Sequence, residues 1–225
     1  VGVLGWNIDG SDPLRIYTIA MKRKDTNMDR INQLLRKVPT WFVYIVGLIP
    51  VPLFLYLAQT SGLGREPIKA LEHELGELAL KLIIVGLAIT PLRKIVGLNL
   101  IKFRRAIGVL AFTYVALHLL VWLVLDVGIL SQIWADILKR PYITIGMVGF
   151  VVMIPLAVTS NNWSVKRLGV KWRRLHQLTY VAAALGGVHF IMIAKGIQLE
   201  PLIYMAVILA LLAYRLPMFA RKRAR

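Results

Sequence analysis

Six long apolar stretches divide this sequence and limit what it can fold into. Each approaches the ~20 residues that a helix needs to cross a bilayer, and polar or Pro- and Gly-containing segments separate them. Because lipid cannot satisfy free backbone N–H and C=O groups, helices are the expected form. Pro50, Pro52 and Pro155 fall inside these stretches and should kink or interrupt the helices. We predict an all-α membrane protein, a six-helix transmembrane bundle. The predicted spans are residues 40–58, 75–92, 106–126, 142–159, 177–194 and 199–217.

The composition agrees with a membrane protein and excludes several kinds of chemistry. Hydrophobic residues make up 58% of the chain, above the roughly 45–50% of soluble domains. The formal net charge is +17, but the basic residues lie in short clusters between the apolar stretches. This arrangement is typical of contact with a lipid bilayer rather than with nucleic acid. The absence of cysteine excludes disulfides, thiol catalysis, Cys-ligated zinc and iron–sulfur clusters.

The distribution of Lys and Arg predicts the orientation of the chain. Segments 21–39, 91–105, 160–174 and 215–225 together hold 21 of these residues, whereas the alternate connections hold 5. Such an excess marks the cytoplasmic side of a multi-pass membrane protein. We therefore expect both termini to lie in the cytoplasm.

This topology divides the chain into three parts. Residues 1–39 form a cytoplasmic N-terminal segment, 40–217 the transmembrane domain, and 218–225 a basic cytoplasmic tail. Residues 1–27 have no apolar period, and Met28 with the basic segment after it resembles an ordinary start of a membrane protein. We expect residues 1–27 to be either a disordered tail or an extension that is not part of the native protein.

Two of the four histidines fall at matching depths inside predicted spans. His118 lies 13 residues after Arg105, and His189 lies 15 residues after Arg174, both arginines being at the cytoplasmic edge of their spans. At 1.5 Å per residue each histidine is about 20 Å deep. Ligating side chains inside a membrane are costly and usually functional. Two neutral imidazoles that face each other across a bundle can serve as axial ligands of haem iron.

The neighbours of His189 agree with a flat cofactor. Ala182, Gly186, His189 and Ile193 follow helical spacing along one face, and the small residues among them leave room for a macrocycle. The same residues also suit tight packing between membrane helices, which needs no cofactor. We expect haem iron at His118 and His189, with close helix packing as the alternative.

His176 permits several interpretations. It precedes His189 by 13 residues, close to the offset at which one helix ligates two stacked haems, but 13 steps turn an ideal helix by about 220°. Arg104 and Arg105 occupy the matching positions on the span of His118, so no second histidine lies opposite. The alternatives are ligation of a second haem by an unusual pair, contact with a flavin or quinone, and a place at the membrane interface.

A polar stripe begins the second predicted span. His73 lies at its exterior end, and Glu77 and Lys81 follow at a spacing where their side chains can pair. Lys81 is well inside the span. One interpretation is that His73 and Lys81 contact a haem propionate or a quinone. The other is that Glu77 simply neutralises Lys81.

Short motifs run in a specific order through the spans and their connections. They are Glu66-Pro67-Ile68-Lys69 to His73, Ile89-Thr90-Pro91-Leu92, Phe103-Arg104-Arg105 with Gly108, Ala116-Leu117-His118-Leu119, Arg140-Pro141-Tyr142-Ile143-Thr144-Ile145-Gly146, Leu156-Ala157-Val158-Thr159-Ser160, and Trp172 through Leu175-His176 to Tyr180, followed by His189. With these motifs the chain resembles the MsrQ (YedZ) family, haem-binding membrane subunits of the ferric-reductase-like transmembrane group. The resemblance covers roughly residues 40–217.

The resemblance implies a six-helix bundle of ferric-reductase-like type that binds haem b, one or two per chain, with His118 and His189 as iron ligands. It also implies FMN. The basic loops, Arg104 and Arg105 among them, offer contacts to a flavin phosphate, although topology and anionic lipid explain the same charges. Larger relatives such as NADPH oxidases carry paired histidines on both corresponding helices, and this sequence departs from them at Arg104 and Arg105.

The resemblance further implies a place in an electron-transfer chain across a bacterial inner membrane. Electrons would come from quinol or a cytoplasmic flavin reductase and pass to a periplasmic molybdenum-containing subunit that reduces methionine sulfoxide. An iron with two axial histidines has no free position for a substrate, so we expect an electron-transfer subunit rather than the catalytic one. No Gly-rich dinucleotide fingerprint follows a strand, which also favours a separate donor. A six-helix transporter and an assembly factor without a redox cofactor are the competing classes.

Overall fold

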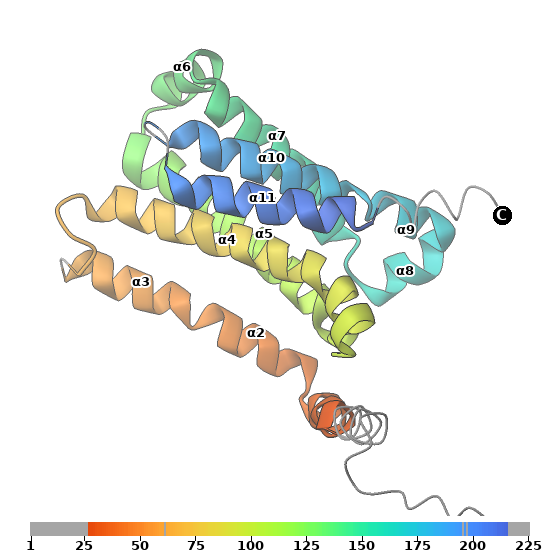
Figure 1. Cartoon of the computed structure of the whole chain (residues 1–225). Helices are drawn as coiled ribbons and strands as arrows, with labels where there is room; N and C mark the ends of the chain where they lie inside the picture. Colours follow the sequence, from red (N-terminus) through yellow and green to blue (C-terminus); the bar gives the residue numbers. More distant parts are fainter. Residues whose placement is uncertain (1–26, 61, 195, 197, 216–225) are drawn as a thin grey trace, which may run out of the picture.

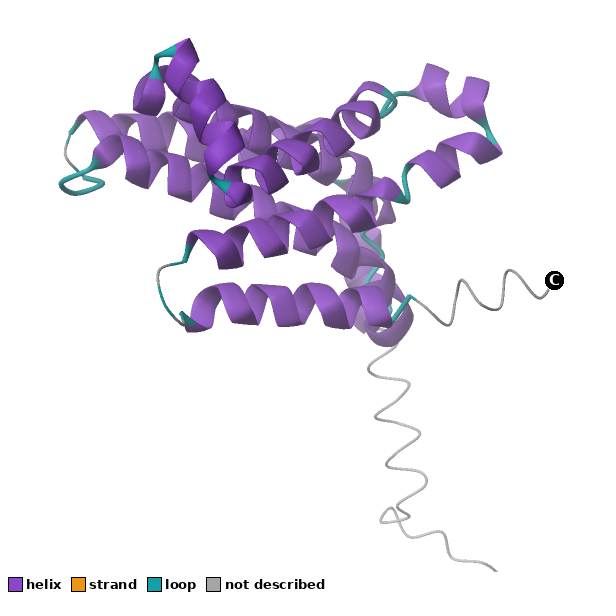
Figure 2. Ribbon diagram, turned by 90° about the horizontal axis from the view of Figure 1, so that it is seen from above, coloured by secondary structure: helices purple, strands orange, loops and turns teal. Residues whose placement is uncertain are grey.

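The computed structural model describes residues 27–60, 62–194, 196 and 198–215, and this part of the chain contains helices, turns and short loops without a strand. Figure 2 shows the helices joined by brief connections. The predicted all-α class is confirmed. The predictions for residues 1–26 and for the tail 218–225 lie outside the described residues.

The helices keep the order of the apolar stretches, with additional short helices between them (Figure 1). Residues 27–37 form a first helix. The others are α2 (Thr40–Leu48), α3 (Pro50–Gln59), α4 (Pro67–Pro91), α5 (Arg104–Val121), α6 (Leu130–Lys139), α7 (Pro141–Val158), α8 (Asn162–Leu168), α9 (Val170–Leu175), α10 (Leu178–Ile193) and α11 (Leu199–Ala213), with π-helical turns at Leu92–Val96 and Trp122–Val127 and a 3₁₀ turn at Ile101–Phe103.

Within the described residues, five helical segments are long and apolar enough to cross a membrane. They are Thr40–Gln59, Pro67–Val96, Ile101–Val127, Pro141–Val158 and Val170–Ile193. The sixth predicted span corresponds to α11, which is apolar but has 15 residues in the described part of the chain. The chain is therefore a multi-pass membrane protein with the predicted arrangement of spans.

The second span begins earlier than the hydropathy pattern predicts. The pattern predicts a start at residue 75, but α4 begins at Pro67. Proline suits the first turn of a helix because its missing N–H would have no partner there. The acidic residues in the first turns of α4 lower the mean hydropathy, so the hydropathy pattern does not reveal the start of the helix. As a result His73 lies within α4, almost two turns after its start, and not at the opening of the span.

The prolines act differently in the two spans that contain them. The first span is interrupted at Ile49, directly before Pro50, and continues as α3. In contrast, α7 continues through Pro155 to Val158. The Thr159 hydroxyl donates a hydrogen bond of 2.6 Å to the Pro155 carbonyl near the end of this helix. The predicted interruption therefore occurs in the first span and is absent from α7.

Two antiparallel helix pairs form the centre of the bundle. α4 packs along α5, and α7 packs along α10, while α11 covers α10 and α4. The pairs meet in an apolar core to which α11 also contributes, with Leu87, Ala183 and Ile208 almost fully buried. α2 and α3 flank this core on one side, and α6 lies at the opposite end of the bundle from α8 and α9 (Figure 1).

Candidate functional site

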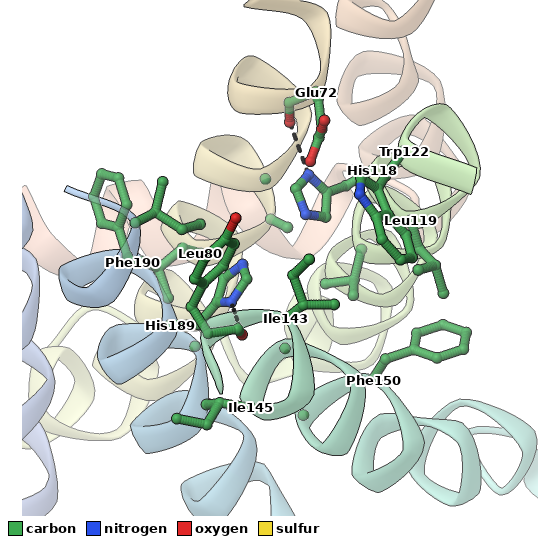
Figure 3. A pocket seen from close by; sticks show the side chains of 18 of the residues that line it. Glu72, Leu80, His118, Leu119, Trp122, Ile143, Ile145, Phe150, His189 and Phe190 are labelled. Carbon is green, nitrogen blue, oxygen red and sulfur yellow. Dashed lines mark hydrogen bonds between the residues drawn. The ribbon is translucent and has the colours of Figure 1, made fainter. Parts of the chain in front are cut away.

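A cavity of about 650 Å³ lies between α4, α5, α7 and α10. Figure 3 shows it from close by. Its walls are mainly apolar, and its lining includes Leu80, Val115, Ile143 and Phe150. The predicted common face of α10 is confirmed, since Ala182, Gly186, His189 and Ile193 all line this cavity.

His118 of α5 and His189 of α10 both enter the cavity and face each other across it (Figure 3). Their ring centroids are 6.2 Å apart, and the ring planes make an angle of 85°. The proximity that equal depth predicts is confirmed. It brings together residues 71 positions apart in the chain, because α5 and α10 belong to the two helix pairs that meet in the core.

Each of these rings is fixed by a backbone carbonyl of the neighbouring helix. His118 Nδ1 donates to the Glu72 carbonyl on α4 at 2.8 Å, and His189 Nδ1 donates to the Tyr142 carbonyl on α7 at 2.7 Å. A carbonyl oxygen can only accept, so the proton of each neutral ring is assigned to Nδ1. The lone pair is then on Nε2, which is the form that binds a metal while the other nitrogen holds the ring in place.

The Nε2 atoms of His118 and His189 could bind one metal ion, provided that a bound group supplies its other ligands. Imidazole nitrogens bind first-row metals at about 2 Å, so two opposed ligands need about 4 Å between their nitrogens. Rings with centroids 6.2 Å apart can provide this separation. No group of three or more His, Cys, Asp or Glu side chains that could hold a metal occurs among the described residues. His118 and His189 would hold the metal of a flat macrocycle, and the mainly apolar walls of the cavity suit such a group.

Comparison with known proteins decides the family. Residues 75–187 match the family model described as ferric reductase like transmembrane component. The protein-methionine-sulfoxide reductase heme-binding subunit MsrQ of Agrobacterium fabrum is 50% identical over 177 residues, which cover 78% of this chain and 82% of that protein. The protein of the same name from Brucella anthropi is 46% identical over 177 residues, with coverage of 78% and 80%. The chain belongs to the MsrQ family. No solved structure matches it.

In this MsrQ family member, the polar stripe of α4 lies partly in the cavity and partly outside it. His73 and Glu77 line the cavity, and the His73 ring lies 5.9 Å from the ring of Phe190. Lys81 Nζ lies 2.5 Å from Glu77 Oε1, so the predicted pairing is confirmed. The Tyr204 hydroxyl of α11 donates to the same oxygen at 2.8 Å. The lining of the cavity does not include Lys81.

The structure separates His176 from the other MsrQ histidines. It lies at the end of the bundle that carries α8 and α9 and stacks on Trp172 with centroids 3.8 Å apart. Its Nε2 is 3.1 Å from the Thr159 hydroxyl, which itself donates to the Pro155 carbonyl. The hydroxyl must therefore accept from His176, which assigns the proton of this ring to Nε2. This is the opposite form from the one assigned to His118 and His189.

The two candidate flavin-contacting arginines lie at this same end. Arg105 Nη1 donates to Asn162 Oδ1 at 2.6 Å, which connects the start of α5 to the start of α8. Arg104 is exposed. The structure therefore brings Arg104, Arg105 and His176 to one end of the bundle, and His73, His118 and His189 to the cavity nearer the other.

The α6 end of the cavity is charged. Lys69, Glu72, Asp126 and Arg140 all belong to its lining. Arg140 Nη1 donates to the Tyr142 hydroxyl at 3.3 Å, and its Nε lies 3.2 Å from Asp136 Oδ1. The hydrogen bond to Tyr142 and the nearby carboxylate raise the pKa of the Arg140 guanidinium above its ordinary value. The sequence motifs include Lys69, Arg140 and Tyr142 but assign them no place in a site. The two carbonyl acceptors are backbone atoms, which no residue type marks.

Proposed function

We propose that this chain is the haem-binding electron-transfer subunit of a methionine sulfoxide reductase system. His118 and His189 would bind one b-type haem iron through their Nε2 atoms. The observation that supports this most strongly is the pair of opposed imidazoles in a membrane-embedded cavity, each with Nδ1 bound to a backbone carbonyl. The names of the relatives from Agrobacterium and Brucella support the same proposal.

When bound, haem supplies one-electron redox chemistry, and the residues of the chain bind and shield it. The two carbonyl acceptors hold the imidazoles and keep their Nε2 lone pairs available. Apolar side chains of the lining, such as Leu80 and Phe150, would shield the bound group from water. With His118 and His189 both holding the iron, no position would remain on the metal for a substrate, so we propose electron transfer as the role of the haem. One haem per chain is proposed, because His176 Nε2 already donates to Thr159.

The proposed route of the electrons runs between the two ends of the bundle. Quinol or a cytoplasmic flavin reductase would be the donor. The acceptor would be a periplasmic molybdenum-containing subunit that reduces methionine sulfoxide, and it would meet the α6 end of the cavity, where charged residues gather. A contact of His73 with a haem propionate or a quinone is part of the proposal, and its place in the cavity lining supports it. Glu77 pairs with Lys81 nearby.

The proposed location is a bacterial inner membrane with both termini in the cytoplasm, and the absence of cysteine makes this testable. Ser131 on α6 and Lys166 on α8 are both exposed. We expect a membrane-impermeant maleimide to label Ser131→Cys in intact spheroplasts, and Lys166→Cys only after permeabilisation, because positive loops stay in the cytoplasm. The reverse labelling pattern would refute the orientation.

FMN is proposed to bind at the α8–α9 end, where Arg104 and Arg105 lie. Replacing both arginines with Ala should lower the flavin content of the purified protein and leave its haem content unchanged, because a flavin phosphate loses charge-assisted hydrogen bonds there. The matched control is Lys166→Ala with Arg167→Ala, an exposed basic pair on α8. Flavin and haem are measured on the same samples. Equal flavin occupancy in both double variants would count against a phosphate site at Arg104 and Arg105.

A further inference from the structure

We infer that Gly76 and Gly146 are positioning residues for the two imidazoles. Each glycine lets a ring lie directly against the neighbouring helix and reach the carbonyl one turn earlier. The role in haem binding rests on the proposed function, whereas the contacts of the rings do not depend on it.

The first contact joins α4 and α5. A Cβ atom added to Gly76 would lie 3.0 Å from His118 Nδ1 and 3.2 Å from its Cε1. These distances are shorter than ordinary van der Waals contact, so the ring would have to move away. The carbonyl that accepts from the same Nδ1 belongs to Glu72, four residues before Gly76.

The second contact repeats this arrangement between α7 and α10. A Cβ atom added to Gly146 would lie 2.8 Å from His189 Cε1 and 2.9 Å from its Nδ1, closer than real Cβ atoms approach. The accepting carbonyl belongs to Tyr142, again four residues before the glycine. Both antiparallel pairs therefore hold their histidine in the same way.

Helix geometry explains why a glycine is needed at this spacing. The carbonyl of residue i already accepts from the N–H of residue i+4, so a second donor must approach it from the side. Each Cα–Cβ bond tilts towards the N-terminus of the helix, and the Cβ of residue i+4 therefore lies over the carbonyl of residue i. Without a Cβ at Gly76 and Gly146, the second lone pair of each carbonyl is open to a ring. This contact fixes the proton on Nδ1 and leaves Nε2 for a metal.

Two further glycines on the same helices provide matched controls. A Cβ at Gly149 of α7 would meet Leu185 Cβ at 3.6 Å, and one at Gly86 of α4 would meet Ile107 Cγ2 at 3.8 Å. Both distances are ordinary contacts. Gly149 also lines the cavity. Ala has a higher helix propensity than Gly at interior positions, so none of the four Gly→Ala substitutions should weaken its helix. A loss that occurs only at Gly76 and Gly146 therefore reports on the histidine rings.

The test compares Gly76→Ala and Gly146→Ala with Gly86→Ala and Gly149→Ala in the purified full-length protein. We expect the first two to weaken haem binding by about 10- to 100-fold, as loss of an outer-shell partner of a metal-binding histidine does, and to change the low-spin electron paramagnetic resonance signal of the haem that remains. Gly86→Ala, outside the cavity lining, should match the wild type, and Gly149→Ala, which adds a methyl group to the cavity away from the histidine rings, should lose much less affinity than Gly76→Ala or Gly146→Ala. Unchanged affinity and signal in Gly146→Ala would refute the inference, and equal loss in Gly149→Ala would show that space in the cavity is what matters.

A measurement without haem separates this inference from the proposed function. Nitrogen-15 NMR of labelled histidine in the haem-free protein reports which ring nitrogen carries the proton. We expect Nδ1–H for His118 and His189 in the wild type, with Gly76→Ala altering only His118 and Gly146→Ala altering only His189. A wild type that shows these signals but binds no haem would reject the proposed function alone. Unaltered ring signals in both variants would reject the positioning role.

Discussion

His118→Ala and His189→Ala should each abolish the low-spin haem spectrum of the purified protein. Each substitution removes one axial bond in a cavity with mainly apolar walls, so water is a poor replacement. The remaining imidazole would leave either a high-spin haem or none. Haem stoichiometry and the optical and electron paramagnetic resonance spectra of the single variants are the measurements.

The other two histidines are the controls for this prediction. His73→Ala should keep the low-spin spectrum, because its ring contacts Phe190 and lies on the wall formed by α4. His176→Ala should also keep it and affect electron entry from the α8–α9 end, since this ring stacks on Trp172 outside the cavity lining. A full bis-histidine spectrum in His189→Ala together with its loss in His176→Ala would mean that the ligand pair is assigned incorrectly.

Glu77→Ala should destabilise the folded bundle by about 3 kcal/mol, which is the cost of an uncompensated lysine near the centre of a membrane helix. Lys81 lies well inside α4, its side chain is 50% exposed, and its Nζ is 2.5 Å from Glu77 Oε1. Removing the carboxylate leaves the ammonium without its counter-charge and leaves the Tyr204 hydroxyl without its acceptor. Thermal unfolding in nanodiscs and the haem content after purification are the measurements.

A second variant and a surface pair identify the cause of this effect. Glu77→Ala combined with Lys81→Ala should recover most of the lost stability, because no charge remains unpaired. Glu66→Ala breaks the Glu66–Lys69 pair, whose side chains are 68% and 62% exposed, and should leave the unfolding temperature close to that of the wild type, because water screens such a pair. A double variant as unstable as Glu77→Ala would assign the loss to packing or to Tyr204 rather than to Lys81.

The sequence predicts the spans and the main histidine pair well because both depend on simple periodic features. Apolar length locates the helices, and the depth of His118 and His189 follows from counting residues from the basic edges. Apolar length predicts the start of α4 too late, because Glu72, Glu74 and Glu77 lower the hydropathy of a segment that is helical from Pro67. Proline at the first helical position was the signal that could have corrected it.

The surroundings of the histidines could not be predicted in the same way. The acceptors at Glu72 and Tyr142 are backbone carbonyls, which every residue has, so the sequence marks them only through the glycines four positions later. The surroundings of His176 could not be predicted either. Its hydrogen-bond partner is Thr159 at the end of α7, and the sequence does not show that these two residues meet. Such contacts arise from how helix pairs dock, and a single sequence without known helix contacts does not contain this information.

The central proposal is one haem held by two histidines, and the reduced-minus-oxidised optical spectrum of the purified wild-type protein, with its haem stoichiometry, tests it most directly. We predict a sharp pair of b-type haem bands from one low-spin haem per chain, because His118 and His189 lie opposite each other with ring centroids 6.2 Å apart. A flat difference spectrum from a protein that is folded and was produced with ample haem would contradict the proposal and favour a transporter or an assembly factor.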